Sequence, residues 1–183
     1  MCVILYNKYD LMYLYLETNR LVIRPVTLDD AMFILNLVNT KGWIKYIGDR
    51  NVNNVQDAKM YIQNILDRSN CFYGIFENKE TKIPMGIVTF LHRETQTYPD
   101  IGFATLPEFE GFGYTLEASQ VFLDSLLSDH YDISKIIAIT KIDNLRSINL
   151  IKKLGLEYYD NDALDQQLSI YMISKMVNQL NQK

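Results

Sequence analysis

Apolar residues recur along this chain with two different periods, one typical of helices and one typical of strands. Stretches with one period alternate with stretches that have the other. Four stretches carry apolar residues three and four positions apart, which predicts amphipathic helices over residues 31–38, 58–66, 118–126 and 144–154. Alternating or continuous apolar runs between them predict strands over residues 14–25, 72–76, 85–91, 100–106, 136–140 and 168–174. The chain contains no internal repeats and no low-complexity linkers.

Residues at the ends of these stretches agree with the predicted boundaries. Thr27, with Asp30 three residues later, forms a partial capping box, and Asn54 and Asn144 are favoured helix N-cap residues. Gly155 suits the left-handed position that follows a helix. Antiparallel pairs early in the chain and one strand–helix–strand crossover late in it predict a mixed α/β sheet.

Composition limits the kinds of protein that this chain can be. A length of 183 residues predicts a single domain with a substantial core. The net charge is −4 and the basic residues are dispersed, so nothing indicates a nucleic-acid footprint. Two cysteines are too few for a disulfide framework, and no apolar run is long enough to span a membrane. We therefore expect a cytoplasmic protein that binds neither nucleic acid nor a membrane.

The N-terminal segment, residues 1–16, is apolar and rich in tyrosine. It lacks a basic region and a small-residue cleavage site, so we do not interpret it as a signal peptide. Met12 is an alternative start of translation, which would make the preceding residues either a strand extension or a loose tail.

The most informative segment is the loop around Gly111 and Gly113, which joins a predicted strand to a predicted helix. Glycines at such a turn let backbone amides approach a ligand closely, and the start of the helix adds a positive dipole end. This combination is suited to binding phosphate. The dinucleotide-binding fingerprint is excluded because Leu116 stands where its third glycine belongs. A P-loop is excluded because Gly113 is followed by Tyr114 and Thr115, so tyrosine stands where the Gly-Lys-Ser/Thr ending requires lysine.

This segment resembles the acetyl-CoA loop of the GNAT acetyltransferases, above all the branch of Rim-type ribosomal-protein N-acetyltransferases. A second segment agrees, because residues 144–156, Asn-Leu-Arg-Ser-Ile-Asn-Leu-Ile-Lys-Lys-Leu-Gly-Leu, are similar to the Asn-x-x-Ser helix of that family. The resemblance covers about residues 15–175. It implies one acetyl-CoA-binding domain over residues 14–176, with an N-terminal extension (1–13) and a C-terminal tail (177–183). It also implies a mostly antiparallel, twisted sheet flanked by about four helices.

The resemblance also implies which residues hold acetyl-CoA, the expected co-substrate. The amides of Gly111, Phe112, Gly113, Tyr114 and Thr115 would hold the pyrophosphate. The backbone of Phe103, Thr105 and Leu106 would pair with the pantetheine arm, and Asn144 and Ser147 would contact that arm near the thioester. The implied partners are acetyl-CoA and an amine acceptor, with the protein acting as a monomer or a homodimer. We expect no metal site.

The chain departs from the family pattern at four positions. Glu108 and Phe112 stand where many members carry a basic residue or glutamine, and Glu110 directly precedes Gly111. Carboxylates near a pyrophosphate repel it, so we expect both glutamates to point to solvent and to weaken CoA binding. The family tyrosine that protonates the leaving thiolate would fall at Ile151, which has no proton to donate.

Transfer of an acetyl group to an amine needs a base and a proton donor. Asp100, on the strand before the glycine loop, is the predicted base, acting directly or through water; alternatively it is a structural aspartate at a strand end. Ser147, or a water molecule, is the predicted donor to the leaving sulfur, although a small residue there would also permit close packing. Weaker base candidates are Glu94, His92 and His130.

Two functions remain open from the sequence. The favoured one is an acetyl-CoA-dependent N-acetyltransferase that moves the acetyl group directly to a primary amine, either a protein N-terminus or a small molecule. The alternative is a catalytically weak CoA-binding or interaction module that kept the fold, which Ile151 and the acidic loop favour. The acceptor walls are expected at residues 41–55 and 159–167, with Trp43, Tyr46 and Tyr73 as either pocket or core aromatic residues.

Overall fold

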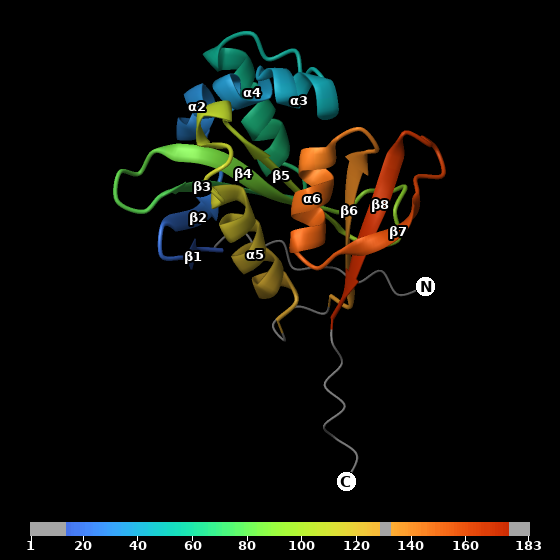
Figure 1. Ribbon diagram of the computed structural model, residues 1–183. Coiled ribbons are helices and arrows are strands. Elements are labelled where there is room, and N and C mark those ends of the chain that lie inside the picture. Colours follow the sequence, from blue (N-terminus) through green and yellow to red (C-terminus); the bar gives the residue numbers. More distant parts are fainter. Residues whose placement is uncertain (1–13, 129–132, 176–183) are drawn as a thin grey trace.

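The strands form one eight-stranded sheet in the order β1-β2-β3-β4-β5-β6-β8-β7 (Figure 1). The computed structural model describes residues 14–128 and 133–175. The strands are β1 (Leu16–Glu17), β2 (Leu21–Pro25), β3 (Cys71–Asn78), β4 (Pro84–Leu91), β5 (Asp100–Thr105), β6 (Lys135–Lys141), β7 (Glu157–Asn161) and β8 (Leu168–Ser174). The helices are η1 (Leu28–Asp30), α2 (Ala31–Val38), α3 (Lys41–Tyr46), α4 (Val55–Leu66), η2 (Pro107–Phe109), α5 (Tyr114–Leu126) and α6 (Leu145–Lys153), of which η1 and η2 are 3₁₀ turns.

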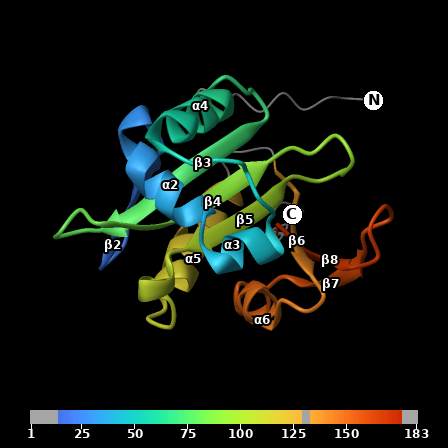
Figure 2. The same cartoon turned by 90° about the horizontal axis from the view of Figure 1, so that it is seen from above.

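Two apolar cores lie on opposite faces of the sheet, because successive side chains of a strand point to opposite faces. Helices α5 and α6 lie side by side over one face (Figure 1), and this core includes Phe72, Phe76, Ile101, Phe122 and Ile151. Helices α2, α3 and α4 cover the other face (Figure 2), and this core includes Ile34, Leu37, Trp43, Ile62 and Ile75. The predicted fold class, a mixed and mostly antiparallel α/β sheet flanked by helices, is confirmed.

The predicted helix ends are confirmed where side chains cap them. The backbone N–H of Thr27 donates to the Asp30 carboxylate at 2.8 Å, and the Asn54 side chain accepts from the Asp57 N–H at 3.0 Å. Gly155 follows α6 with φ = +85°, a left-handed conformation that glycine adopts without strain.

Strands β5 and β6 form the parallel pair of the sheet, and they pair at one position, Asp100 with Ile137. On its other side β5 pairs with β4 at six positions, from Gly86 with Thr105 to Leu91 with Asp100. The two parallel strands therefore part beyond Asp100 and leave a gap that opens toward the glycine loop. Since α5 connects these strands, the predicted strand–helix–strand crossover is confirmed.

Three elements differ from the prediction. A turn at Thr18–Arg20 divides the single strand expected over residues 14–25, because the Thr18 hydroxyl accepts from the Leu21 N–H at 2.8 Å and bends the chain. Residues 41–46 form helix α3, which begins where Thr40 caps the Trp43 N–H. Residues 157–161 form β7, an edge strand that alternation did not reveal, because its residues are exposed on both faces.

Some predictions fall on residues that the structure does not describe. His130, Met12, the N-terminal extension (1–13) and the C-terminal tail (177–183) lie outside the described residues. Among the helices of residues 14–128 and 133–175, none combines the length and the apolar character needed to cross a membrane.

Candidate functional site

The gap between β5 and β6 exposes backbone groups of β5 to the interior of the site. Leu106 donates its N–H to the Met85 carbonyl of β4 at 2.9 Å, and its own carbonyl accepts from Phe109 at 3.0 Å. Because backbone groups alternate along an antiparallel strand, Phe103 and Thr105 direct theirs toward β6 instead. Of the three residues predicted to pair with a pantetheine arm, Phe103 and Thr105 face the gap, whereas Leu106 has both main-chain groups engaged within the chain.

The glycine loop has the backbone form that the sequence predicted. Gly111 and Gly113 have φ = +84° and +80°, values that favour glycine, and Gly113 is the N-cap of α5. The hydroxyls of Thr105 and Thr115 are 2.6 Å apart, which ties the end of β5 to the first turn of α5. The first amides of a helix lack partners within the helix, so this loop presents amides at a positive dipole end, a form suited to an anion.

Arg20 supports the loop from a position 92 residues away in sequence, and the sequence reasoning missed it. Its guanidinium donates to the Phe112 carbonyl at 3.1 Å and to Glu117 at 2.5 and 2.7 Å. It also lies 4.5 Å from the centre of the Tyr114 ring. Burial raises the pKa of Glu117, but hydrogen bonds from Thr18 and Arg20 outweigh it and hold this pKa below its usual value. No local pattern could have identified Arg20.

The two loop glutamates are placed differently from each other. Glu108 is exposed, as predicted. Glu110 is also exposed, as predicted, and in addition it forms an ion pair with Arg146 on α6. Within the described part of the chain, Glu110 is the polar partner of Arg146, whose side chain is 86% exposed. This pair spans from the glycine loop to α6.

Asn144 and Ser147 lie at the start of α6, where β6 ends. The Asn144 side-chain oxygen accepts from the Ser147 N–H at 3.3 Å, so Asn144 is the N-cap that the sequence predicted. The Ser147 side chain is partly buried, and its hydroxyl makes no hydrogen bond within the described residues. Ile151, one turn later, is 1% exposed in the core beneath α6, which leaves Ser147 as the hydroxyl on this helix start.

Asp100 lies at the point where β5 and β6 part. It is 3% exposed, and its carboxylate accepts from two nitrogens of Arg93 at 2.7 Å each. Burial raises the pKa of Asp100 to about 6, against the opposing effects of Arg93 and of a backbone hydrogen bond from Ile139. A carboxyl with this pKa is largely ionised at neutral pH and more basic than an ordinary aspartate. The aspartate is therefore an ion-pair partner with a raised pKa, and its role as the base stays a prediction.

Alternation along β5 shows which face Asp100 occupies. Ile101 and Phe103 pack toward α5, whereas Ala104 packs on the face covered by α2, α3 and α4. Asp100 shares the second face, because it is two residues from Gly102 and four from Ala104. The predicted base and the glycine loop's helix therefore lie on opposite faces of the same strand.

Helix α3 lies beside this second face at the end of β6. The Lys141 ammonium donates to the Lys45 carbonyl at 2.8 Å, and Lys45 pairs with Asp143 at 3.1 Å. Trp43 of this helix is 5% exposed in the core, whereas Tyr46 is partly exposed and accepts a hydrogen bond from Lys45 at 2.8 Å. Residues 41–46 therefore lie beside the end of β6, and their role as an acceptor wall stays a prediction.

The remaining candidates are less well placed. Burial lowers the pKa of His92, and Glu94 is exposed on the loop before β5. Burial raises the pKa of Tyr73, helped by neighbouring Tyr61, so this phenol stays protonated. In residues 14–128 and 133–175, no three His, Cys, Asp or Glu side chains are grouped to hold a metal ion.

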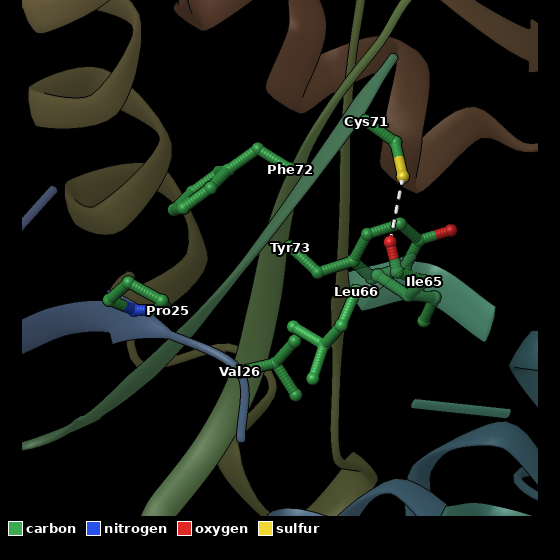
Figure 3. Close-up of a pocket in the computed structure, with 7 residues that line it drawn as sticks. All are labelled: Pro25, Val26, Ile65, Leu66, Cys71, Phe72 and Tyr73. Carbon is green, nitrogen blue, oxygen red and sulfur yellow. Dashed lines mark hydrogen bonds between the residues drawn. The ribbon is translucent and has the colours of Figure 1, made fainter. Parts of the chain in front are cut away.

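A small pocket between β3 and α4 is not the site. Figure 3 shows Cys71 and Tyr73 directed toward Ile65 and Leu66, with Phe72 directed away. The cavity measures about 30 Å³, room for little more than a water molecule. None of its lining residues belongs to the predicted cofactor set, so the open gap and the glycine loop form the candidate site.

Comparison with known proteins agrees with this geometry. The family described as Acetyltransferase (GNAT) domain matches residues 20–157. YnaD of Bacillus subtilis (strain 168), named an uncharacterized N-acetyltransferase, is 27% identical over 144 residues, covering 78% of this chain and 82% of YnaD.

Two solved structures share the fold. RimL, the ribosomal L7/L12 alpha-N-protein acetyltransferase in complex with coenzyme A, matches with a TM-score of 0.75 at 14% identity, covering 88% of this chain and 98% of RimL. The ribosomal-protein-S5-alanine acetyltransferase of Vibrio fischeri matches with a TM-score of 0.72 at 16% identity, covering 89% of this chain and 97% of that one. The resemblance to Rim-type proteins is therefore confirmed at the level of fold.

Proposed function

The chain belongs to the GNAT acetyltransferase family, and we propose that it transfers the acetyl group of acetyl-CoA directly to a primary amine. The observation that carries this proposal is the parting of β5 and β6 beside the glycine loop. One strand edge offers unpaired backbone groups, one loop offers helix-start amides, and a buried carboxylate lies where the strands diverge. Such an arrangement suits a long ligand with an anionic end and a reactive end.

The cofactor end of the site is assigned to main-chain groups. We infer that the amides of residues 111–115 hold the pyrophosphate and that Phe103 and Thr105 pair with the pantetheine arm. Backbone donors at a helix start bind anions without a charged side chain, which makes Phe112 acceptable where relatives carry other residues. Acetyl-CoA supplies an activated thioester as the acyl source.

The reacting end is assigned to Asp100 and Ser147. Asp100 takes a proton of the substrate ammonium through water, so that the neutral amine can attack the thioester carbonyl; its pKa of about 6 narrows the gap to an amine pKa near 10. The Ser147 hydroxyl, which has no hydrogen-bond partner in the described residues, donates to the departing sulfur. With Ile151 in the core, this serine or a water molecule takes the part of the family tyrosine.

For the acceptor, we propose a protein N-terminus or a small primary amine. The fold-level likeness to RimL and to the S5-alanine acetyltransferase, both named for ribosomal proteins, supports the first. The α-amino group has a pKa near 8, lower than that of lysine. A water-linked aspartate can therefore deprotonate an α-amine more readily than a lysine side chain.

The experiment is a thiol-release assay with acetyl-CoA and a panel of amines, including peptides with free N-termini and matched peptides with blocked ones. Release of free thiol that depends on an unblocked α-amine supports peptide acetylation. Release of thiol with small amines but not with peptides would indicate that the acceptor is a small primary amine. Binding of CoA by calorimetry without thiol release from any acceptor would favour the alternative of a weak CoA-binding module.

A further inference from the structure

Two arginines flank the glycine loop, and each is paired with a glutamate, but the two pairs differ. Arg20 is held by Glu117, by the Phe112 carbonyl and by the Tyr114 ring, and its side chain is 45% exposed. Arg146 has one polar partner in the described residues, Glu110, and its side chain is 86% exposed. Arg20 is therefore a fixed part of the loop, whereas Arg146 is free to change partners.

Glu110 is an unusual partner in this location. It directly precedes Gly111, so it brings a negative charge to the edge of a loop built to bind an anion. The ion pair places the Arg146 guanidinium at the same edge, one helical position before Ser147. An exposed ion pair contributes at most about 1 kcal/mol, so a phosphate that offers two oxygens to the guanidinium can displace the carboxylate.

We propose that Arg146 is a phosphate-binding residue of the cofactor site, and that it exchanges Glu110 for a phosphate group of CoA. This inference rests on the proposed function and adds a side-chain contact to a loop otherwise limited to backbone amides. When CoA is not bound, the Glu110 carboxylate pairs with the guanidinium and keeps it at the loop. The cost of breaking the pair lowers the affinity for CoA, and the new contact raises it.

The experiment measures CoA binding by calorimetry for the wild type and for Arg146→Gln, Glu110→Gln and the double variant. We expect Arg146→Gln to weaken binding about three- to tenfold and Glu110→Gln to tighten it about two- to fivefold. The decisive comparison is made with Glu110 already removed. There, Arg146→Gln still weakens binding at least threefold if Arg146 contacts a phosphate. If it has no effect in that background, Arg146 merely neutralises Glu110, and the proposal is overturned.

A matched control separates a local contact from general electrostatics. Lys153→Gln removes one positive charge from the exposed last turn of the same helix. It should change CoA affinity less than twofold; a loss equal to that of Arg146→Gln would also overturn the proposal.

Repeating the titrations with dephospho-CoA identifies the phosphate. An Arg146 effect that disappears with this ligand assigns the contact to the 3′-phosphate, and one that persists assigns it to the pyrophosphate. Wild-type protein that binds neither ligand would instead contradict the proposed function itself.

Discussion

The two sides of the β5–β6 gap differ in composition: one is formed by backbone groups and the other by side chains. The proposed cofactor side consists of backbone: two left-handed glycines, the first amides of α5 and the unpaired edge of β5. The proposed acceptor side consists of side chains from separate segments: Asp100 on β5, Arg93 before it and helix α3 near the end of β6. A site made of backbone groups tolerates substitutions that leave the backbone conformation unchanged, whereas a site made of side chains changes with each substitution. We therefore expect variants of the acceptor side to alter turnover, and variants of the loop to alter cofactor affinity.

Asp100→Asn should have the largest effect, because it removes the proposed base while keeping the shape of the side chain. We expect kcat to fall about 10- to 1,000-fold, the usual scale of one acid–base contribution, with CoA affinity unchanged. Because burial raises the pKa of Asp100 to about 6, kcat/KM of the wild type should rise through about pH 6 as the carboxyl ionises. A variant that keeps the wild-type rate and the same rising limb would place the base elsewhere.

Arg93→Gln tests whether the rising limb of the kcat/KM profile reports the ionisation of Asp100. Arg93 lowers the pKa of Asp100, so its removal should raise this pKa and move the rising limb of kcat/KM to higher pH. The measurement is the pH profile of both proteins in the same buffers. A limb that does not move reports a group other than Asp100, such as the amine.

Gly113→Val tests the glycine loop, which lies on the proposed cofactor side of the gap. A Cβ at this position meets Arg20 at 3.7 Å, an ordinary contact, so space is not the obstacle. The left-handed φ of +80° is the obstacle, because a β-branched residue there must change the path of the loop. CoA affinity should fall at least about tenfold by calorimetry, roughly 1.4 kcal/mol.

Gly155→Val is the matched control for that change. Gly155 has φ = +85° at the end of α6, away from the loop, so the substitution brings similar strain. It should lower the melting temperature and leave CoA affinity unchanged. If Gly113→Val also leaves CoA affinity unchanged, the loop does not bind the cofactor.

Arg20→Ala tests whether the loop is held in place from the start of β2. Loss of the contacts with Glu117 and the Phe112 carbonyl should raise KM for acetyl-CoA about three- to tenfold while kcat changes less than twofold. Arg20→Lys keeps the charge but not the forked geometry, so it should recover only part of the affinity. An equal fall in kcat for both variants would indicate a role in catalysis rather than in positioning.

Glu108→Gln should have the smallest effect. This carboxylate is exposed on η2, and removing its charge should tighten CoA by no more than about fivefold, with the gain eroded by salt. Glu80→Gln makes the same charge change in the exposed β3–β4 turn and should have no effect. Weaker CoA binding by the Glu108 variant would contradict the repulsion on which this prediction rests.

Much of the fold and of the cofactor side followed from local patterns. Apolar periods located the hairpin of β3 and β4, the strand β6 and the helices α2, α4, α5 and α6, because each helix buries one face and these strands are apolar runs buried on both faces. Glycines at a strand-to-helix turn indicated the left-handed form of the loop before α5, since only glycine adopts those backbone angles freely. Helix α3 and strand β7 were missed, because α3 is short and β7 is exposed along its length.

The amino-acid sequence by itself determined the family, the glycine loop and the identity of Asn144 as a helix cap, because each depends on residues that are neighbours along the chain. Only the tertiary structure decided that β5 and β6 part beyond Asp100, that Arg20 supports the loop and that Arg146 pairs with Glu110. It also decided that Leu106 has its backbone groups engaged and that burial raises the pKa of Asp100. These features depend on distances between residues far apart in sequence and on exclusion of water, which arise when the chain packs.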